Sequence, residues 1–170
     1  RFRVKERIQE EIQLTLNQYA QKTFETFLKK GDINTKSIFY TPAQKIMIAR
    51  LSSEHFQKHL FERSGQLNGE ETEFAMRLDV LDNVLWWFRN REKEDFYLQG
   101  WRPGKFYPDF IIKTKSGAYI LAEYKGGDRL SNDDTSYKEE LGQLWEKLNN
   151  GKDKFFLVGK ANMDTALKAI

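Results

Sequence analysis

Two carboxylates, fourteen positions apart, carry the clearest chemistry in this 170-residue chain. Asp109 follows Pro108 at the start of an aromatic and β-branched run, and Glu123 lies near the end of a second such run. Both runs have the composition of β-strands. The short polar segment Lys115-Ser116-Gly117 separates them and suits a three-residue hairpin loop. The sequence therefore predicts an antiparallel hairpin with an acidic residue on each strand.

The loop also predicts the register of this hairpin. With Ser116 at the apex, Asp109 and Glu123 each lie seven residues away and face each other, whereas a slip of one residue would place Asp109 opposite Tyr124. Opposed side chains share a face, with Cβ atoms about 4.5–5.5 Å apart. The two-residue period of a strand adds Lys125 to that face. We expect two carboxylates and a lysine to converge at one place.

Two like charges at such spacing repel unless a cation lies between them. Mg²⁺ takes oxygen ligands and is often held by one or two carboxylates together with water and substrate phosphate. There it would acidify a water molecule and withdraw charge from a phosphoryl oxygen, while Lys125 would hold the attacking water or neutralise charge on phosphorus. The alternative is a cross-strand salt bridge on a solvated face. The hydrophobic flanks favour a site, because buried charges need compensation.

These residues resemble a known signature. Pro108-Asp109 followed by Glu123-Tyr124-Lys125 is similar to the motif of the PD-(D/E)xK, or restriction-endonuclease-like, nuclease superfamily. A longer set, over about residues 68–160, resembles the C-terminal nuclease domain of the Res subunit of type III restriction enzymes. Its segments are Glu73-Phe74-Ala75, Leu78-Asp79, Trp86-Trp87-Phe88-Arg89-Asn90, Tyr107-Pro108-Asp109-Phe110 and Glu123-Tyr124-Lys125-Gly126.

The resemblance implies an α/β fold with a mixed β-sheet flanked by helices and a Mg²⁺-dependent endonuclease that hydrolyses DNA phosphodiester bonds. It implies that Asp109, Glu123 and the backbone carbonyl of Tyr124 bind Mg²⁺, for which Mn²⁺ would substitute. Lys125 would orient the attacking water, and a glutamate from the helix before the hairpin would join the metal site. Glu73 occupies the matching position, and the products would carry 5′-phosphate and 3′-hydroxyl ends.

The same resemblance implies the partners: double-stranded DNA, an upstream helicase or translocase domain of the same chain, and a modification methyltransferase subunit. ATP would act only through that motor, because the chain contains no Gly-x-x-x-x-Gly-Lys-Ser/Thr phosphate loop. Two alternatives stay open: a same-fold repair or mobile-element nuclease, and a non-catalytic DNA-binding or scaffold module. A Gln-x-x-x-Tyr element after Lys125 would favour the repair exonucleases. Gln143 is the only glutamine after Lys125, and Lys147 stands where the tyrosine would be, which disfavours a repair exonuclease.

Glu73 is a charged residue on the apolar side of its predicted helix. Asn68 is typical of an N-cap with Glu71 three residues on, and apolar spacing predicts that the helix continues to about Arg89. Glu73 falls within the arc of a second apolar stripe, on the face expected to be buried, where a carboxylate needs a partner or a metal. An Arg77 pair four residues on is the alternative, and Glu71 is the next candidate for the site. The stripe consists of Val80, Val84 and Trp87.

Two loops offer cations for DNA phosphates. Arg102 and Lys105 lie in an aromatic and glycine-containing turn, and Arg129 follows the glycines after Lys125. Glycine lets a backbone approach phosphate closely. Solvated turns with no DNA contact have the same composition, so both alternatives remain.

The remaining pattern predicts a mainly helical N-terminal segment over residues 1–67. Residues 68–170, which the resemblance identifies as the nuclease core, follow the order α-β-β-β-α-β, which suits one mixed sheet with helices on both faces. Apolar spacing at Val4–Leu28 predicts a helix that ends at Gly31. His55 and His59 lie four residues apart, and we interpret both as surface residues on a helix. The other predictions are strands at 37–40, 95–101 and 154–158, helices within 43–61 and at 137–148, and a closing helix near Ile170.

Composition narrows the functional classes. A net charge of +3 excludes a uniformly basic DNA coat, so any DNA surface must be local. The chain contains no cysteine, which excludes disulfides and thiolate metal sites. No apolar run reaches the roughly 20 residues of a membrane span, so we expect a cytoplasmic protein. Arg1 opens directly on a helical pattern, which indicates a piece of a longer protein.

Overall fold

The computed structural model describes residues 2–31, 55–126 and 133–170. The chain divides into two compact units. One comprises Arg1–Ser37 with Leu98–Phe106, and the other comprises Ile38–Tyr97 with Tyr107–Ile170. The chain before residue 68 thus contributes to both units. The functional division at residues 67 and 68 stays a prediction.

The first unit contains a long helix and a small hairpin. The helix α1 (Phe2–Lys30) ends at Gly31, whose φ of +76° favours glycine and whose amide donates to the Leu28 carbonyl at 3.0 Å. The predicted helix and its stop are therefore confirmed. Strand β2 (Leu98–Gln99) pairs antiparallel with β3 (Lys105–Phe106). The buried ring of Phe24 lies 5.9 Å from that of Trp101 in the hairpin.

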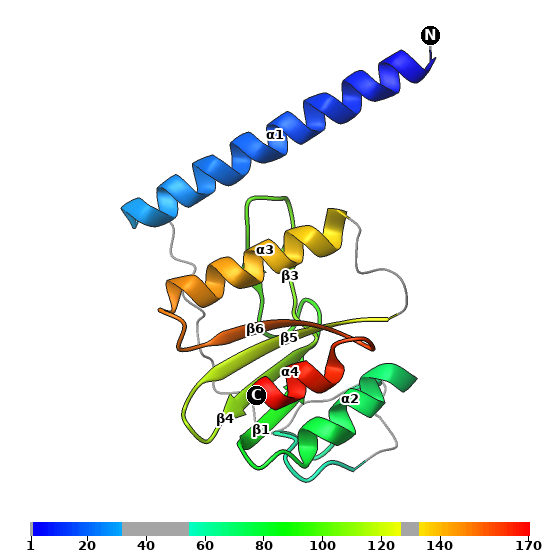
Figure 1. Cartoon of the computed structure of the whole chain (residues 1–170), viewed down its shortest axis with the longest axis vertical. Helices are drawn as coiled ribbons and strands as arrows, with labels where there is room; N and C mark the ends of the chain where they lie inside the picture. Colours follow the sequence, from blue (N-terminus) through cyan, green and yellow to red (C-terminus); the bar gives the residue numbers. More distant parts are fainter. Residues whose placement is uncertain (1, 32–54, 127–132) are drawn as a thin grey trace. The chain divides into compact units, whose positions relative to one another are not determined.

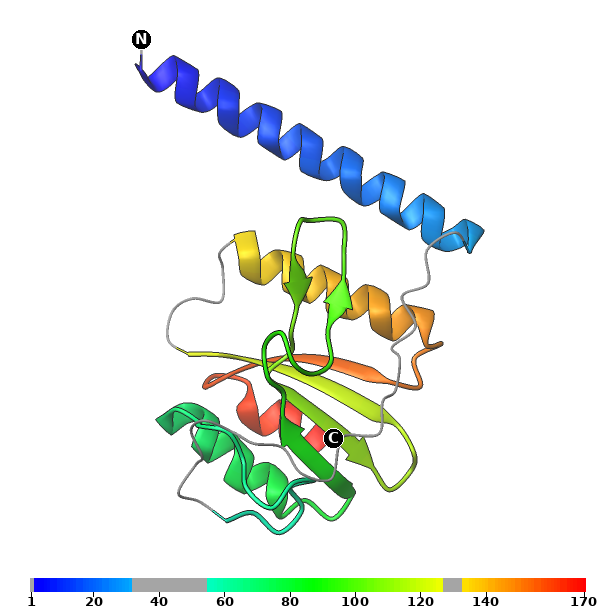
Figure 2. The same cartoon turned by 180° about the vertical axis from the view of Figure 1, so that it is seen from behind.

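The second unit is a mixed sheet covered by helices. Its elements are α2 (Gly69–Asp79), β1 (Val84–Arg89), β4 (Phe110–Thr114), β5 (Tyr119–Lys125), α3 (Asp133–Leu148), β6 (Lys154–Gly159) and α4 (Met163–Ala169). The strand order is β1-β4-β5-β6, with β5 and β6 parallel and the other neighbours antiparallel. Figures 1 and 2 show α3 on one face and α2 and α4 on the other. The prediction of a mixed α/β fold is confirmed.

The hairpin that carries the two carboxylates has the predicted register. Phe110 pairs with Ala122 and Lys113 pairs with Tyr119, so each pair is centred on Ser116. The Thr114 amide donates to the Ala118 carbonyl at 3.0 Å and closes the turn. Gly117 has a φ of +88°, which the three-residue loop requires. Composition and loop length were sufficient to fix this register.

The helix before the hairpin is shorter than its apolar spacing predicts. Helix α2 ends at Asp79, and the apolar residues that follow form strand β1, so the prediction of a helix to Arg89 is wrong. The run Val84–Arg89 is rich in aromatic residues, which favour strands when the sheet covers them. Val80 is 74% exposed and belongs to no buried stripe. The strand predicted at 95–101 shrinks to Leu98–Gln99, and β1 takes its place as first strand of the sheet.

The segment just before α2 lies along the outer edge of β1. The Leu60 amide donates to the Trp87 carbonyl at 2.8 Å, and His59 and Trp87 form a parallel bridge. His59 is partly buried with its ring 4.7 Å from that of Trp87, and burial lowers its pKa. The prediction of a surface helix is wrong for His59, while His55 is exposed. The strand predicted at 37–40 and most of 43–61 lie outside the described residues.

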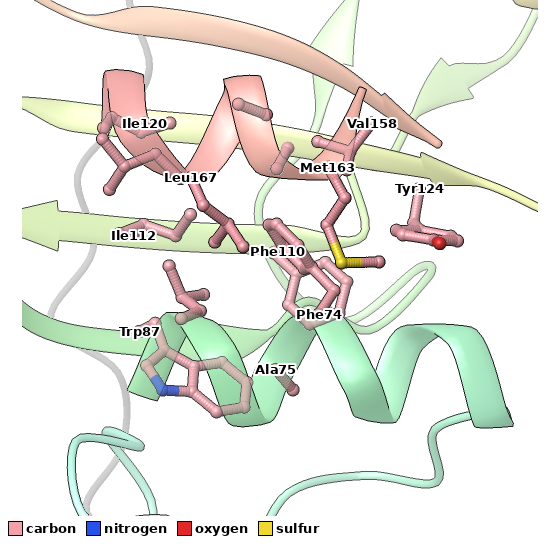
Figure 3. Close-up of a cluster of buried hydrophobic side chains, with 14 of the residues drawn as sticks. Phe74, Ala75, Trp87, Phe110, Ile112, Ile120, Tyr124, Val158, Met163 and Leu167 are labelled. Carbon is pink, nitrogen blue, oxygen red and sulfur yellow. The ribbon is translucent and has the colours of Figure 1, made fainter. Parts of the chain in front are cut away.

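The main core lies between the sheet and helices α2 and α4. Figure 3 shows Phe74 of α2 and Met163 of α4 meeting beside Phe110 of β4. On the opposite face α3 packs closely on β6. A Cβ atom at Gly142 would lie 2.3 Å from Cγ of Phe155, so only glycine permits this approach. The close packing sets the distance of α3 from the strands of the hairpin.

Candidate functional site

Asp109 lies immediately before β4 and is held from two sides. Its Oδ2 accepts the amide hydrogen of Tyr124 at 2.8 Å, which ties it to the neighbouring strand. Its carbonyl accepts from the Asn90 amide at 2.8 Å, which continues the pairing of β1 with β4. Pro108 before it is fully buried. The register, continued by one residue, places Asp109 across from Glu123, as predicted.

Glu123 is a buried carboxylate with two cations on one oxygen. Its Oε1 lies 2.9 Å from Nζ of Lys125 and 3.2 Å from Nζ of Lys138. Its Oε2 has no hydrogen-bond partner among the described residues. Burial and then the negative charge of Asp109 raise the pKa of Glu123, and the two lysines only partly offset this. A buried, unpartnered carboxylate oxygen is costly to keep unless a ligand uses it.

Lys138 was not predicted as a site residue. It comes from α3, where Asp134 lies one turn earlier and contacts its ammonium at 3.1 Å. Burial lowers the pKa of Lys138, but the negative charges of Glu123 and Asp134 outweigh that effect, so the pKa lies above its ordinary value. Lys138 is therefore a permanent cation at neutral pH. Sequence spacing gave no signal for it, because only the packing of α3 brings it to β5.

Arg89 and Glu71 form the other side of the site. Nη1 of Arg89 lies 2.8 Å from Oδ1 of Asp109, and Nη2 lies 3.2 Å from Oε1 of Glu71. Glu71 is also the N3 residue of a capping box with Asn68 at the start of α2, as its spacing predicts. The cations of the network are thus Arg89, Lys125 and Lys138, and its carboxylates are those of Asp109, Glu123, Glu71 and Asp134.

Glu73 lies outside this network. Its side chain is exposed, so the expectation that it occupies a buried arc of its helix is wrong. The predicted alternative, a pair with Arg77, does not form either, because Arg77 pairs with Asp164. The physical reason is that α2 presents Phe74 and Leu78 to the core, which turns Glu73 outward. Glu71, the next candidate, is the helix glutamate that the structure brings to Asp109.

The acidic start of α2 also lies near the end of β5. A Cβ atom at Gly126 would come 2.8 Å from Oε2 of Glu70. Burial, followed by the charges of Glu70, Glu73 and Glu71, raises the pKa of the Tyr124 hydroxyl. The amide of Tyr124 donates to Asp109. The predicted role of its backbone carbonyl as a metal ligand stays a prediction.

The oxygen donors of the site fit the divalent ion that the sequence predicts only in part. Among the described residues, no group of three or more histidine, cysteine, aspartate or glutamate side chains is arranged to hold a metal ion. The predicted set with Glu73 is therefore not assembled. The pair Asp109 and Glu123 still offers hard oxygen donors, and the unpartnered Oε2 of Glu123 fits such an ion. A site on this pair would rely on water and substrate for its other ligands.

Two of the three predicted DNA-contacting cations belong to the first unit. Arg102 and Lys105 belong to the β2–β3 hairpin of the first unit, where Lys105 is exposed and Arg102 is half-buried. Arg129 lies outside the described residues. Their contact with DNA stays a prediction.

Comparisons of this chain with protein-family models, with curated proteins and with solved structures find no match. Among the residues that the structure describes, no helix combines the length and apolarity needed to cross a membrane. The function must therefore be argued from the site.

Proposed function

We propose that this chain carries a metal-dependent endodeoxyribonuclease of the restriction-endonuclease-like kind. In this proposal the second unit is the nuclease domain of a type III restriction enzyme Res subunit or a related helicase–nuclease. It cuts double-stranded DNA in the cytoplasm, supplied by an upstream motor and directed by a modification subunit. The residues that support the proposal are Asp109, Glu123 and Lys125, at the spacing that motivated it.

One observation carries the proposal. Glu123 is 4% exposed, lies across from Asp109 in the register, and keeps one carboxylate oxygen without a partner among the described residues. A carboxylate retained only for stability would have both oxygens hydrogen-bonded at such depth. An arrangement that raises a carboxyl pKa through burial and a second carboxylate is typical of functional sites.

The roles follow from the donors present. Asp109 and Glu123 would hold Mg²⁺, with Mn²⁺ as substitute, and the bound ion would supply Lewis-acid activation of water and of the phosphoryl group. Lys125 would orient the attacking water and neutralise charge on the phosphate. Lys138 and Lys125 lower the pKa of Glu123 and so partly offset the effect of its burial. Glu71 replaces Glu73 as the helix glutamate that is linked to Asp109, through Arg89.

The charge balance of the site favours an anionic substrate. Four carboxylates and three cations interact here when Asp134 is included, so a divalent ion alone would leave one excess positive charge. A phosphodiester brings negative charge together with oxygen ligands, which Mg²⁺ commonly shares between protein and phosphate. A neutral substrate would offer no such compensation.

The test is nicking of supercoiled plasmid by the 170-residue chain in Mg²⁺. Asp109→Asn and Glu123→Gln should each reduce the rate by about a hundredfold or more, because both remove charge at the reacting centre. Asp153→Asn is the matched control, since Asp153 is about as buried as Glu123 but lies at the other end of β5. Unchanged nicking by Asp109→Asn would reject the site.

A second candidate is a DNA-binding module without catalysis. The observation that favours it is that Asp109 and Glu123 already pair with cations and no third carboxylate completes the predicted metal set. This candidate predicts Mg²⁺-independent DNA binding by the wild-type chain and no nicking. The same plasmid experiment, with a mobility-shift assay beside it, separates the two.

A further inference from the structure

Arg89 and Asn90 belong to the aromatic-rich segment that the sequence singled out without assigning it a role. Asn90 forms two reciprocal hydrogen bonds with the backbone of Phe96, at 2.8 and 3.1 Å, and so anchors the chain that follows β1. Arg89 points to the carboxylates instead. Its guanidinium lies between Asp109 and Glu71, whose side chains are only 17% and 12% exposed.

We propose that Arg89 is the residue that positions Asp109, and that Glu71 locks Arg89 in place. The inference rests on the proposed function, because it assigns Arg89 a part in preparing that site. Asp109 needs such a residue because it precedes β4 and its side chain is not fixed by strand pairing alone.

The geometry shows how a single guanidinium fixes Asp109. Nη1 of Arg89 donates to the Asp109 carbonyl at 2.9 Å and lies 2.8 Å from Oδ1 of the same residue. The Tyr124 amide holds the other carboxylate oxygen at 2.8 Å. Backbone and carboxylate of Asp109 are thus held together, which leaves its side chain little rotational freedom. A planar, rigid fork of donors suits this task, and a lysine ammonium does not reproduce it.

Glu71 connects this arrangement to helix α2. Its Oε2 accepts the Asn68 amide at 2.9 Å within the capping box, while Oε1 contacts Arg89. The two oxygens therefore serve two partners, one in the helix start and one in the site. Glutamine also serves at the N3 position of a capping box. Glu71→Gln keeps the cap but removes the negative charge that holds Arg89, leaving only a neutral hydrogen-bond acceptor.

The matched control is Arg91, two residues further on. Its side chain has the same exposure as that of Arg89, 21%, and forms two hydrogen bonds with the buried carboxylate of Asp95. Arg91→Met removes an equivalent buried ion pair without touching Asp109. If breaking a buried ion pair is by itself enough to speed Tyr124 exchange or to slow nicking, both arginine variants should show that change.

The first measurement is hydrogen exchange of the Tyr124 amide in the metal-free chain. In Arg89→Met, exchange should accelerate by about tenfold or more relative to Arg91→Met at matched stability, since the hydrogen bond to Asp109 is weakened. Glu71→Gln and Arg89→Lys should show smaller changes in the same direction, and they preserve the test if Arg89→Met fails to fold. Exchange equal to that of Arg91→Met would overturn the inference.

The second measurement is plasmid nicking in Mg²⁺ by the same variants. Arg89→Met should lower kcat by about 10- to 100-fold, as loss of a residue that orients a ligand does, with KM for DNA nearly unchanged. Arg89→Lys should recover only part of this loss. An Arg89→Met variant as fast as Arg91→Met would overturn the inference even with a nicking wild type. A wild type that does not nick rejects the proposed function, while Tyr124 exchange still decides whether Arg89 positions Asp109.

Discussion

The two ends of strand β5 are each closed by a carboxylate that accepts a tyrosine amide, yet they differ in charge. At one end Asp153 accepts from Tyr119 at 2.7 Å, and no cation of the described residues forms an ion pair with it. At the other end Asp109 accepts from Tyr124 at 2.8 Å, within a network of four carboxylates and three cations. The Asp153 end meets the needs of the backbone alone. The Asp109 end contains far more charge than backbone pairing requires.

The difference separates a structural carboxylate from a candidate functional one. An aspartate that only caps an unpaired amide needs one hydrogen bond, and its burial is offset by that bond. Collecting several ionised groups in a partly buried place costs desolvation energy for each. Such a cluster persists when the groups serve a ligand or a reaction. The predictions below test this contrast.

The largest contrast is expected between Asp153→Ala and Asp109→Ala. Asp153→Ala leaves the part-buried Tyr119 amide without its side-chain acceptor, which should lower the free energy of unfolding by about 1–3 kcal/mol. Plasmid nicking by the folded fraction should stay within about twofold of wild type, a difference that corresponds to roughly 0.4 kcal/mol in the barrier. Asp109→Ala should lose nicking altogether. Urea unfolding measures the stability of each variant, and plasmid nicking at the same temperature measures its activity. A strong loss of nicking in Asp153→Ala would remove the distinction between a structural and a functional carboxylate.

A smaller effect concerns pH and Glu123. Burial and the charge of Asp109 raise the pKa of Glu123 above the ordinary 4.5. The Glu123 carboxyl therefore stays protonated to higher pH in the folded chain than in the unfolded chain. The contribution of Glu123 to the free energy of unfolding therefore falls as pH rises above 4.5, and it levels off above the pKa of Glu123 in the folded chain. Glu123→Gln mimics the protonated form. Without metal it should raise Tm at about pH 7 by a few degrees, since about 1 kcal/mol shifts Tm by about 2–4 °C at this size.

The pH dependence supplies the control for that prediction. The gain in Tm should shrink towards zero below about pH 4, where wild-type Glu123 is itself protonated. Asp153→Asn, measured over the same pH range, should show no such gain at neutral pH because its hydrogen bond weakens. A Glu123→Gln variant that is less stable than wild type at pH 7 would mean that the lysines, not burial, dominate at this carboxylate.

The sequence predicted the hairpin of this site well because its determinants are local. A glycine-containing loop of fixed length set the register, and alternation then placed Asp109, Glu123 and Lys125 on one face. Long-range contacts were beyond such reasoning. Lys138 reaches Glu123 only because Gly142 lets α3 pack closely on Phe155.

The errors around α2 have one cause. Leu81, Leu85 and Phe88 recur at helical spacing, but they continue a pattern across a turn at residues 80–83 into strand β1. Spacing alone cannot separate a helix from a short helix followed by a strand. The mistaken helix hid Arg89 as well, because its guanidinium reaches Asp109 from the end of β1 rather than from a helix face.

The smallest effect is expected at Glu73, the site residue that the structure turns outward. Glu73→Ala removes an exposed carboxylate with no ion pair among the described residues, so stability should change by less than about 0.5 kcal/mol. Nicking should stay within about twofold of wild type, because Glu71, not Glu73, contacts the Arg89–Asp109 pair. Glu71→Gln, measured beside it, should slow nicking more. If Glu73→Ala were instead the slower variant, the helix glutamate of the site would be Glu73, and α2 would have to rotate when DNA binds.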